Sequence, residues 1–287
     1  MPRSLPVDGF SLAFDRSGAG PPALLLHGWP GTRADFRALV PMLADAMDMV
    51  VPDLRGFGES DKHAVEPAQG YSAAAQARSV VGLMDELALD RVVLAGYDIG
   101  SRIAQTVART APQRVRALVL APPLPGAGDR VLSAAAQREF WYQAFHRLPL
   151  ADQLLDGKPE AIRAYLRHFW SHWSGPSFEL ADADLDQLVA SYAEPGAFTA
   201  SIGWYRAGSG TVATSLAERA PAERIDVPAR VLWPEHDPLF PREWGDRLDA
   251  YFSRVTVTPM PGAGHFSPLE APEAFAVAIR EARAGGW

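Results

Sequence analysis

A Gly-x-Asp-x-Gly pentapeptide at residues 96–100 constrains the fold of this chain more than any other stretch. The residues before it, 91–94, are mostly apolar and β-branched, which predicts a buried strand. From Ser101 to Thr110 the apolar side chains recur with a helical period. A strand that passes into a helix between two glycines is typical of a nucleophile elbow, which holds its middle residue, here Asp98, on a strained turn. The alternative for the pentapeptide alone is an ordinary turn aspartate between two glycines.

The residue at the centre of the elbow decides the chemistry. Serine is usual at this position, and the chain has Asp98 instead. A carboxylate that attacks carbon leaves an alkyl-enzyme ester, so we expect substrates with an electrophilic sp³ carbon and a leaving group. The N-terminus of the helix that follows favours negative charge at this point.

Strand and helix patterns alternate along most of the chain. Strand patterns occur at residues 10–14, 23–26, 49–51, 91–94, 115–120, 229–233 and 255–260. Helical patterns lie between or after them, at residues 34–46, 71–87 and 101–110 and from about residues 241 and 272 onward. This order predicts an α/β fold with a mostly parallel, doubly wound sheet.

Residues 129–214 interrupt the alternation. They show no clear strand, and their helical patterns are rich in aromatic residues. A chain of 287 residues is long for one core, so one large domain with an insertion or two domains is expected. We therefore predict an inserted helical cap at 129–214 and an α/β core made of residues 1–128 and 215–287.

Two further polar residues follow strands where an elbow enzyme needs them. Asp237 comes after the strand at 229–233, and His265 comes after the strand at 255–260. Both are predicted in loops at the carboxyl edge of the sheet, where open α/β folds place their ligands. His265 would deprotonate the water that hydrolyses an ester on Asp98, and Asp237 would hold the imidazole tautomer. Glu235, two residues before Asp237, is the competing acid.

The strand at 23–26 ends in His27-Gly28-Trp29-Pro30. Such a loop supplies backbone rather than a nucleophile, and Pro30 restricts the turn. We predict that the backbone N–H groups of Trp29 and Ile99 stabilise the oxyanion that forms on Asp98. His27 is expected to have a structural role, orienting this loop.

Composition excludes several classes of function. The net charge of −7 argues against nucleic acid and against an anionic membrane as partners. The absence of cysteine rules out disulfides and thiolate metal sites. His168 and His172 have the spacing of a metal pair, but no third ligand is evident, so no metal is predicted. Without a secretory h-region at residues 1–14 or an apolar run of about 18 residues, a soluble cytoplasmic protein is expected.

Several separated motifs together resemble the α/β-hydrolase-fold epoxide hydrolases, in particular the soluble bacterial enzymes. The likeness covers nearly the whole chain in order. It is carried by residues 27–31 (HGWPG), 53–58 (DLRGFG), the elbow at Asp98, 264–266 (GHF) and the cap segments 141–143 (WYQ), 168–174 (HFWSHWS) and 204–206 (WYR). The position after the nucleophile departs from the pattern, because many relatives carry an aromatic residue or Arg where this chain has Ile99.

The resemblance implies that Tyr142 and Tyr205 are the ring-opening acids. It also implies substrate contacts from Trp29, Ile99, Gln143 and Phe266. No cofactor is implied. The expected partners are a small apolar epoxide and water, and a homo-oligomer stays open. The leading hypothesis is thus an epoxide hydrolase that forms a vicinal diol through an ester on Asp98.

Two other functions remain open. A haloalkane or haloacetate dehalogenase would use the same Asp98 nucleophile, and a binding protein of this fold could have lost turnover. Arg102 could clamp a substrate carboxylate, as in a fluoroacetate-type dehalogenase. That family also has an Arg directly after the nucleophile and a His-Trp pair in the cap, where this chain has Ile99, Tyr142 and Gln143. We therefore predict Arg102 on the helix surface.

Overall fold

The computed structural model describes residues 2–219 and 221–285. Within them one seven-stranded sheet has the order β1-β3-β2-β4-β5-β6-β7. Every neighbouring pair is parallel except β1 and β3. The strands are β1 (Phe14–Ser17), β2 (Pro22–Leu26), β3 (Asp48–Pro52), β4 (Val92–Gly96), β5 (Val115–Leu120), β6 (Ala229–Pro234) and β7 (Val255–Met260).

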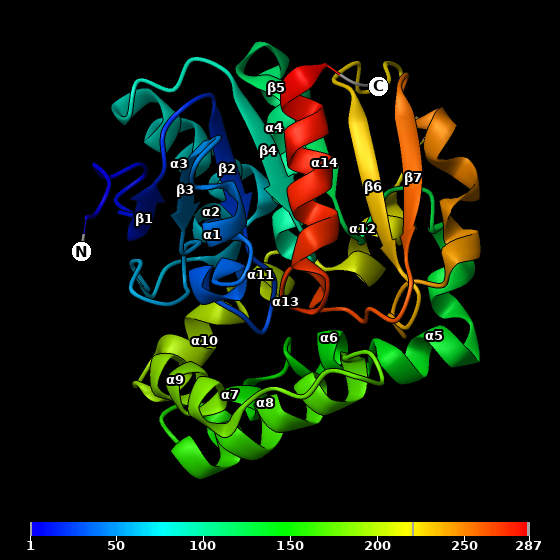
Figure 1. The fold of residues 1–287 in the computed structure, drawn as a ribbon. Helices are drawn as coiled ribbons and strands as arrows, with labels where there is room; N and C mark the ends of the chain where they lie inside the picture. The colour runs from blue at the N-terminus through cyan, green and yellow to red at the C-terminus, as the bar shows by residue number, and fades with distance from the viewer. Residues whose placement is uncertain (1, 220, 286–287) are drawn as a thin grey trace.

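Helices cover both faces of the sheet, with α14 in front and α3 and α4 behind in Figure 1. All five residues of β4 are buried, as expected for a central parallel strand between two helical layers. The predicted α/β fold with a mostly parallel, doubly wound sheet is therefore confirmed. The described helices before residue 128 and after residue 217 are η1 (Arg33–Phe36), α1 (Val40–Leu43), α2 (Pro67–Gly70), α3 (Ala73–Glu86), α4 (Ile99–Thr110), η2 (Pro112–Arg114), η4 (Arg242–Ala250), α13 (Ser267–Glu270) and α14 (Pro272–Ala284).

Three predicted elements differ from the structure. The helix expected at 34–46 is two short turns, because Thr32 caps η1 and Pro41 begins α1 anew. The alternating pattern at 10–14 belongs mostly to a turn and isolated bridges, and the paired strand is β1. The helix expected from residue 241 is the 3₁₀-helix η4.

Between β5 and β6 the chain forms only helices and their connections within the described residues. We call residues 128–217 the helical segment. In Figure 1 it lies below the carboxyl ends of the strands. Its elements are η3 (Gly128–Leu132), α5 (Ala134–Glu139), α6 (Trp141–Phe145), α7 (Pro149–Leu155), α8 (Pro159–Trp173), α9 (Asp182–Ala193), α10 (Ala197–Ser201), α11 (Gly203–Arg206) and α12 (Thr211–Ala217).

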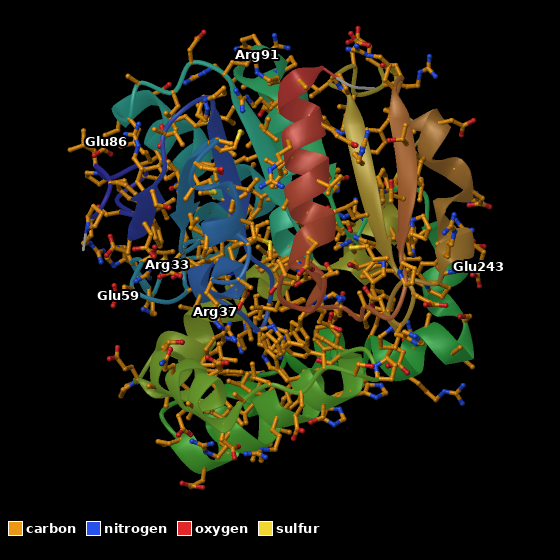
Figure 2. All side chains as sticks on the ribbon, in the orientation of Figure 1. Arg33, Arg37, Glu59, Glu86, Arg91 and Glu243 are labelled. Atoms are coloured by element: carbon orange, nitrogen blue, oxygen red, sulfur yellow. The ribbon has the colours of Figure 1, made fainter. Side chains whose placement is uncertain are left out.

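Side chains crowd the boundary between the helical segment and the sheet edge (Figure 2). Trp29, from the loop after β2, is fully buried there. Its ring contacts aromatic rings of the segment, including Tyr142 and Phe169. Aromatic packing of this kind joins the two parts over the ends of the strands. No helix in the described part of the chain has the length and hydropathy that crossing a membrane requires.

Candidate active site

Asp98 occupies a strained position at the junction of β4 and α4. Its φ of 47° and ψ of −126° lie outside the regions that non-glycine residues favour. Gly96 and Gly100 cannot carry a side chain, because a Cβ at either position would clash with backbone atoms. A Cβ on Gly100 would lie 2.1 Å from the Leu26 carbonyl oxygen, and one on Gly96 would lie 2.6 Å from the carbonyl carbon of Gly100. The chain therefore has the backbone of a nucleophile elbow at this point.

Two backbone donors reach the Asp98 carboxylate. The N–H of Trp29 donates to Oδ2 at 2.7 Å, and the N–H of Ile99 forms a second hydrogen bond. Burial raises the pKa of Asp98, while charged His265 and these two N–H groups oppose the rise. The arrangement can accept negative charge on either the carboxylate or a tetrahedral intermediate derived from it.

The loop that carries the Trp29 N–H is held by His27, as predicted. His27 is buried, and its Nε2 accepts a hydrogen bond from the Leu54 N–H at 3.0 Å. An unprotonated Nε2 leaves the proton on Nδ1, which lies 2.9 Å from the Gly28 carbonyl oxygen. Burial lowers the pKa of His27, which favours this neutral form.

The structure brings His265 and Asp237 together beside Asp98. His265 Nδ1 lies 2.9 Å from Asp237 Oδ2, and His265 Nε2 lies 3.9 Å from Asp98 Oδ1. Nε2 is buried and has no hydrogen-bond partner among the described residues. Burial opposes the charged imidazolium, but the charge and hydrogen bond of Asp237 raise the pKa of His265 overall. Glu235 is exposed and accepts the Gly262 N–H at 2.9 Å instead.

Tyr142 and Tyr205 meet in the same region from helices α6 and α11. Both are buried, their ring centroids are 5.5 Å apart, and their hydroxyls share a hydrogen bond. Gln143 Nε2 also donates to the Tyr142 hydroxyl at 3.2 Å, and the Tyr142 ring stacks on Trp29. Burial is the main cause that raises the pKa of both phenols; the charge of Asp98 comes next for Tyr142, and the neighbouring Tyr142 comes before Asp98 for Tyr205. Both phenols therefore stay protonated at neutral pH and can donate.

One cavity joins these groups. Asp98, Ile99, Arg102, Tyr142, Gln143 and Tyr205 are among the residues that line it. Its volume of about 10 Å³ is close to the space that one water molecule needs. The carboxylate and both phenols thus face the same small space.

The predicted substrate contacts divide into two groups. Ile99 and Gln143 lie in the cavity wall. The Trp29 indole lies behind the Tyr142 ring, on which it stacks. Phe266 lies against Trp170, with ring centroids 3.5 Å apart. The structure therefore places Trp29 and Phe266 outside the wall of this cavity.

Arg102 corrects a prediction, because it does not lie on the helix surface. Its side chain lines the cavity, and its Nη2 donates to the Leu124 carbonyl at 3.1 Å. Within the described residues its buried Nε finds no hydrogen-bond partner. The helical period of α4 could not reveal this, since the 123–125 loop that covers the side chain comes from after β5. Trp204, another wall residue, was not predicted either, although it is adjacent to Tyr205 in sequence.

His168 and His172 do not form a metal site. Their rings stack with centroids 5.7 Å apart, and His172 Nε2 lies 2.7 Å from Glu139 Oε2. Among the described residues no group of three or more His, Cys, Asp or Glu side chains could hold a metal ion.

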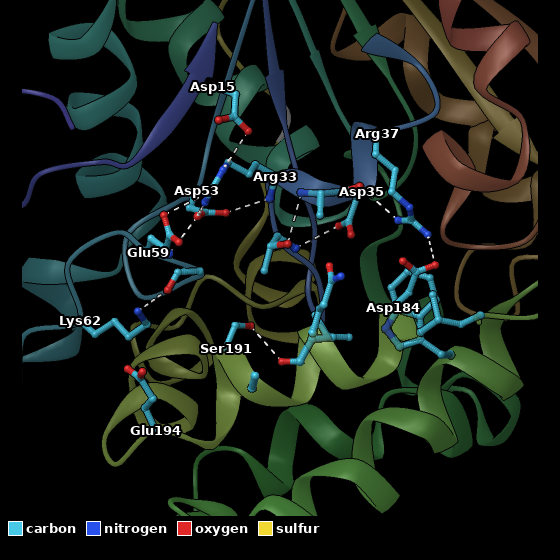
Figure 3. A pocket seen from close by; sticks show the side chains of 18 residues that line it. Asp15, Arg33, Asp35, Arg37, Asp53, Glu59, Lys62, Asp184, Ser191 and Glu194 are labelled. Atoms are coloured by element: carbon cyan, nitrogen blue, oxygen red, sulfur yellow. Dashed lines mark hydrogen bonds and ion pairs between the residues drawn. The ribbon is translucent and has the colours of Figure 1, made fainter. Parts of the chain in front are cut away.

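A larger cavity, about 650 Å³, lies elsewhere, between η1, the 53–62 loop and α9 (Figure 3). Its charged groups are mostly paired with one another: Arg33 with Asp53 and Arg37 with Asp184. Asp98 is not part of its lining. Its size does not make it the site of chemistry, because the elbow carboxylate and both phenols line the smaller space.

Asp35 lies in the wall of the large cavity and connects it to the elbow. Its side chain is buried, and the Tyr97 hydroxyl donates to Asp35 Oδ2 at 2.6 Å. Burial raises the pKa of Asp35 to about 7, against the opposing effect of the Tyr97 hydrogen bond. The residue directly before Asp98 is thus anchored to a titratable group.

Residues 21–272 match the family model described as the alpha/beta hydrolase fold. A soluble epoxide hydrolase from Corynebacterium sp. (strain C12) is 27% identical, over 93% of this chain and 91% of the relative. A fluoroacetate dehalogenase from Burkholderia sp. is 28% identical, over 92% and 87%. The structure of the epoxide hydrolase CorEH matches with a TM-score of 0.85 at 23% identity, over 99% of this chain and 98% of that one, a likeness of fold. The named activities of the two sequence relatives differ, so identity alone does not choose between them.

Proposed function

The chain belongs to the alpha/beta hydrolase fold family, and on that premise we propose that it is an epoxide hydrolase that converts an epoxide and water to a vicinal diol. One observation carries the proposal: two hydrogen-bonded phenols line the cavity that also contains the elbow carboxylate. A halide leaves as a weak base and needs only hydrogen-bond donors. An opened epoxide leaves as an alkoxide, which is comparable in basicity to hydroxide and needs a proton.

In the first step Asp98 attacks an epoxide carbon. The new C–O bond forms the ester, the epoxide C–O bond breaks, and the oxygen takes a proton from Tyr142 or Tyr205. Burial raises the pKa of both phenols, so they are protonated when the epoxide binds, and the alkoxide that forms beside them is basic enough to take the proton as the C–O bond breaks. The hydrogen bond between the two phenols lets the second stabilise the phenolate that the first becomes.

In the second step His265 takes a proton from water, which attacks the ester carbonyl. The N–H groups of Trp29 and Ile99 stabilise the tetrahedral oxyanion. When the ester C–O bond breaks, the diol oxygen takes the proton that the attacking water left on the new carboxyl group, so Asp98 is again a carboxylate. The imidazolium proton then returns to the phenolate. Asp237 keeps the imidazole oriented and stabilises its charged form.

Residues 129–214 act in this proposal as a cap over a core of residues 1–128 and 215–287. The support is that the helical segment lies at the carboxyl edge of the sheet and contributes both phenols (Figure 1). The reaction as written needs no cofactor, and its substrates are a small, mostly apolar epoxide and water.

A haloacetate dehalogenase is the second candidate, and one observation favours it. The half-buried Arg102 lies in the wall of the cavity with its Nε buried and without a hydrogen-bond partner among the described residues, and its guanidinium could attract a carboxylate substrate. Incubation with styrene oxide and with fluoroacetate separates the two activities. The epoxide hydrolase proposal expects diol and no fluoride, whereas fluoride release without diol would replace it with the dehalogenase. Stoichiometric binding of an epoxide without product would instead identify a binding protein.

The covalent ester is tested with the His265→Gln variant. This variant should still be alkylated, because His265 acts only in hydrolysis, so an adduct with the mass of styrene oxide should accumulate on Asp98. Intact-mass and peptide mass spectrometry measure it. In wild-type protein, a single turnover in heavy-oxygen water should put the label into Asp98. Label found only in the diol would rule out the ester.

A further inference from the structure

Glu270 ends α13, five residues after His265, and its carboxylate accepts three backbone N–H groups. Gly264 donates to Oε2 at 2.7 Å and Phe266 donates to Oε1 at 2.9 Å. These two residues flank His265 on both sides. The third donor is Gly175, which donates to Oε2 at 2.7 Å from the chain that follows α8. One carboxylate therefore joins the His265 loop to the helical segment.

The same two stretches also touch through their backbones. The His265 N–H donates to the Trp173 carbonyl at 2.8 Å. A Cβ on Gly264 would lie 2.3 Å from the nitrogen of Gly175, and a Cβ on Gly175 would lie 2.1 Å from the carbonyl oxygen of Gly262. Only glycine allows the two backbones to approach this closely. The carboxylate of Glu270 therefore hydrogen-bonds to two chain segments that already lie in contact.

An ionised carboxylate suits this junction better than an amide would. It offers acceptors only, on two oxygens, and three charge-assisted hydrogen bonds satisfy them. Burial raises the pKa of Glu270, while the three N–H groups and the charge of His265 oppose that rise. Among the described residues Glu270 has no ion-pair partner, so backbone dipoles hold its charge.

We propose that Glu270 is a positioning residue for ester hydrolysis. It fastens the loop that carries His265 to the end of α8 and so holds Nε2 in place against Asp98. This inference rests on the proposed function, because hydrolysis of an ester on Asp98 is the step in which His265 acts. Alkylation of Asp98 does not require the imidazole, so the two steps should respond differently when Glu270 is changed.

Three carboxylates from separate elements surround His265. Asp237 follows β6, Asp98 follows β4, and Glu270 ends α13; all three favour the charged imidazolium. Tyr97, Trp173, Phe240 and Phe266 supply the remaining ring contacts. Removing the charge of Glu270 should lower the pKa of His265. The base would then be neutral at lower pH, which moves the acid limb of the hydrolysis rate to lower pH.

The test is Glu270→Gln, studied by single turnover with styrene oxide between pH 5 and 9. Quenched samples give the rates of Asp98 alkylation and ester hydrolysis separately. We expect alkylation to change by less than about 2-fold and hydrolysis to slow by about 10- to 100-fold, as for a displaced catalytic group. The matched control is Glu235→Gln, an exposed acid that accepts the Gly262 N–H of the same loop. Both of its rates should match those of wild type.

Glu270→Asp separates the effect of the charge from the effect of the side-chain length. Its shorter side chain keeps the charge and loses hydrogen bonds, so hydrolysis should slow while the acid limb stays in place. This variant also carries the test if Glu270→Gln does not fold. Unchanged hydrolysis, or an equal slowing of both steps, overturns the positioning role. If wild-type protein forms no ester, the proposed function fails first, before any variant is compared, and this inference fails with it.

Discussion

At the scale of single residues, the hydrogen bond between Tyr142 and Tyr205 is the observation on which the proposed alkoxide leaving group depends. Both phenols are buried, and burial holds their pKa values above the ordinary value of tyrosine. They therefore remain protonated donors at neutral pH. A hydroxyl that cannot ionise by itself releases its proton only when an alkoxide forms beside it, which confines the acid catalysis to the ring-opening step.

We expect Tyr142→Phe and Tyr205→Phe each to slow alkylation of Asp98 by on the order of 10². The double variant should be nearly inactive and the two effects non-additive, because either phenol can partly replace the other. Rapid-quench measurement of ester formation tests this. A double variant that opens epoxides at the wild-type rate would show that both tyrosines are packing residues.

Asp35 makes folding stability depend on pH. Its pKa is about 7 in the folded protein and 3.8 in the reference state. Between these values the unfolded chain has lost the proton and the folded chain has kept it. The stabilisation is complete below about pH 4 and is lost as pH rises through 7, on the order of 4 kcal/mol.

Urea unfolding at pH 5 and pH 8 measures this contribution. The wild type should lose more stability between the two pH values than Asp35→Asn, which keeps an acceptor for the Tyr97 hydroxyl and has no proton to lose. The exposed residue Asp45 provides the control, since Asp45→Asn should behave as wild type. Equal losses in wild type and Asp35→Asn would contradict the expectation.

The positions of the site residues could be predicted only where the neighbouring sequence determines them. Asp98, Asp237 and His265 each follow an apolar strand, and parallel strands bring such loops to one edge. Asp35, Arg102 and Glu270 could not be found in this way. Each has a hydrogen-bond partner that lies 22 to 95 residues away in sequence, and no spacing rule encodes such contacts.

At the scale of elements, the elbow depends on β4 and α4 lying against β2. Gly100→Ala would place a methyl group against the Leu26 carbonyl, a backbone atom that cannot rotate away. We expect a loss of about 3 kcal/mol of unfolding free energy or more, together with loss of activity. Thermal unfolding and the alkylation rate measure both.

Gly82→Ala in the middle of α3 is the control for that variant. The atoms nearest to its new methyl group all belong to the half-buried Val7 side chain, which can rotate. Alanine also has the better helix propensity, so stability should change little or rise. Similar losses in the two variants would mean that backbone contact at Gly100 is not the cause.

The order of elements was more predictable than their bounds. β5 lies where its apolar run predicts it, because a buried strand has a strong and continuous signal. β7 also lies at its predicted position, although most of its residues are exposed. The predicted helix at 34–46 is broken, because Pro41 begins a turn inside an otherwise periodic stretch. The pattern of the helical segment indicates helices, but it does not say which faces meet the sheet.

At the scale of the molecule, the helical segment donates hydrogen bonds to the loop that follows β2. Trp170 Nε1 donates to the Pro30 carbonyl and the Tyr192 hydroxyl donates to the Gly31 carbonyl, each at 3.1 Å. These are the two residues that follow Trp29, the N–H donor to Asp98. The segment and the core should therefore unfold as one cooperative unit.

Trp170→Phe tests this coupling. Phenylalanine can keep the stack on Phe266, but the buried Pro30 carbonyl loses its donor, which should cost about 1–3 kcal/mol. We expect one urea transition that moves to lower concentration when followed by both tryptophan fluorescence and circular dichroism. Trp141→Phe, at an exposed position of the same segment, should leave the midpoint nearly unchanged. Two separate transitions would contradict a single unit.

The cavity beside Asp98 has room for about one water molecule, which is the smaller of the two reactants. An organic substrate can therefore enter only if the cavity enlarges, which requires the side chains of Tyr142 and Trp204 in its wall to move. Hydrostatic pressure opposes any step that expands the system. For this protein, compression should act against substrate in the way a competing ligand does, raising the apparent KM most for the bulkiest epoxides.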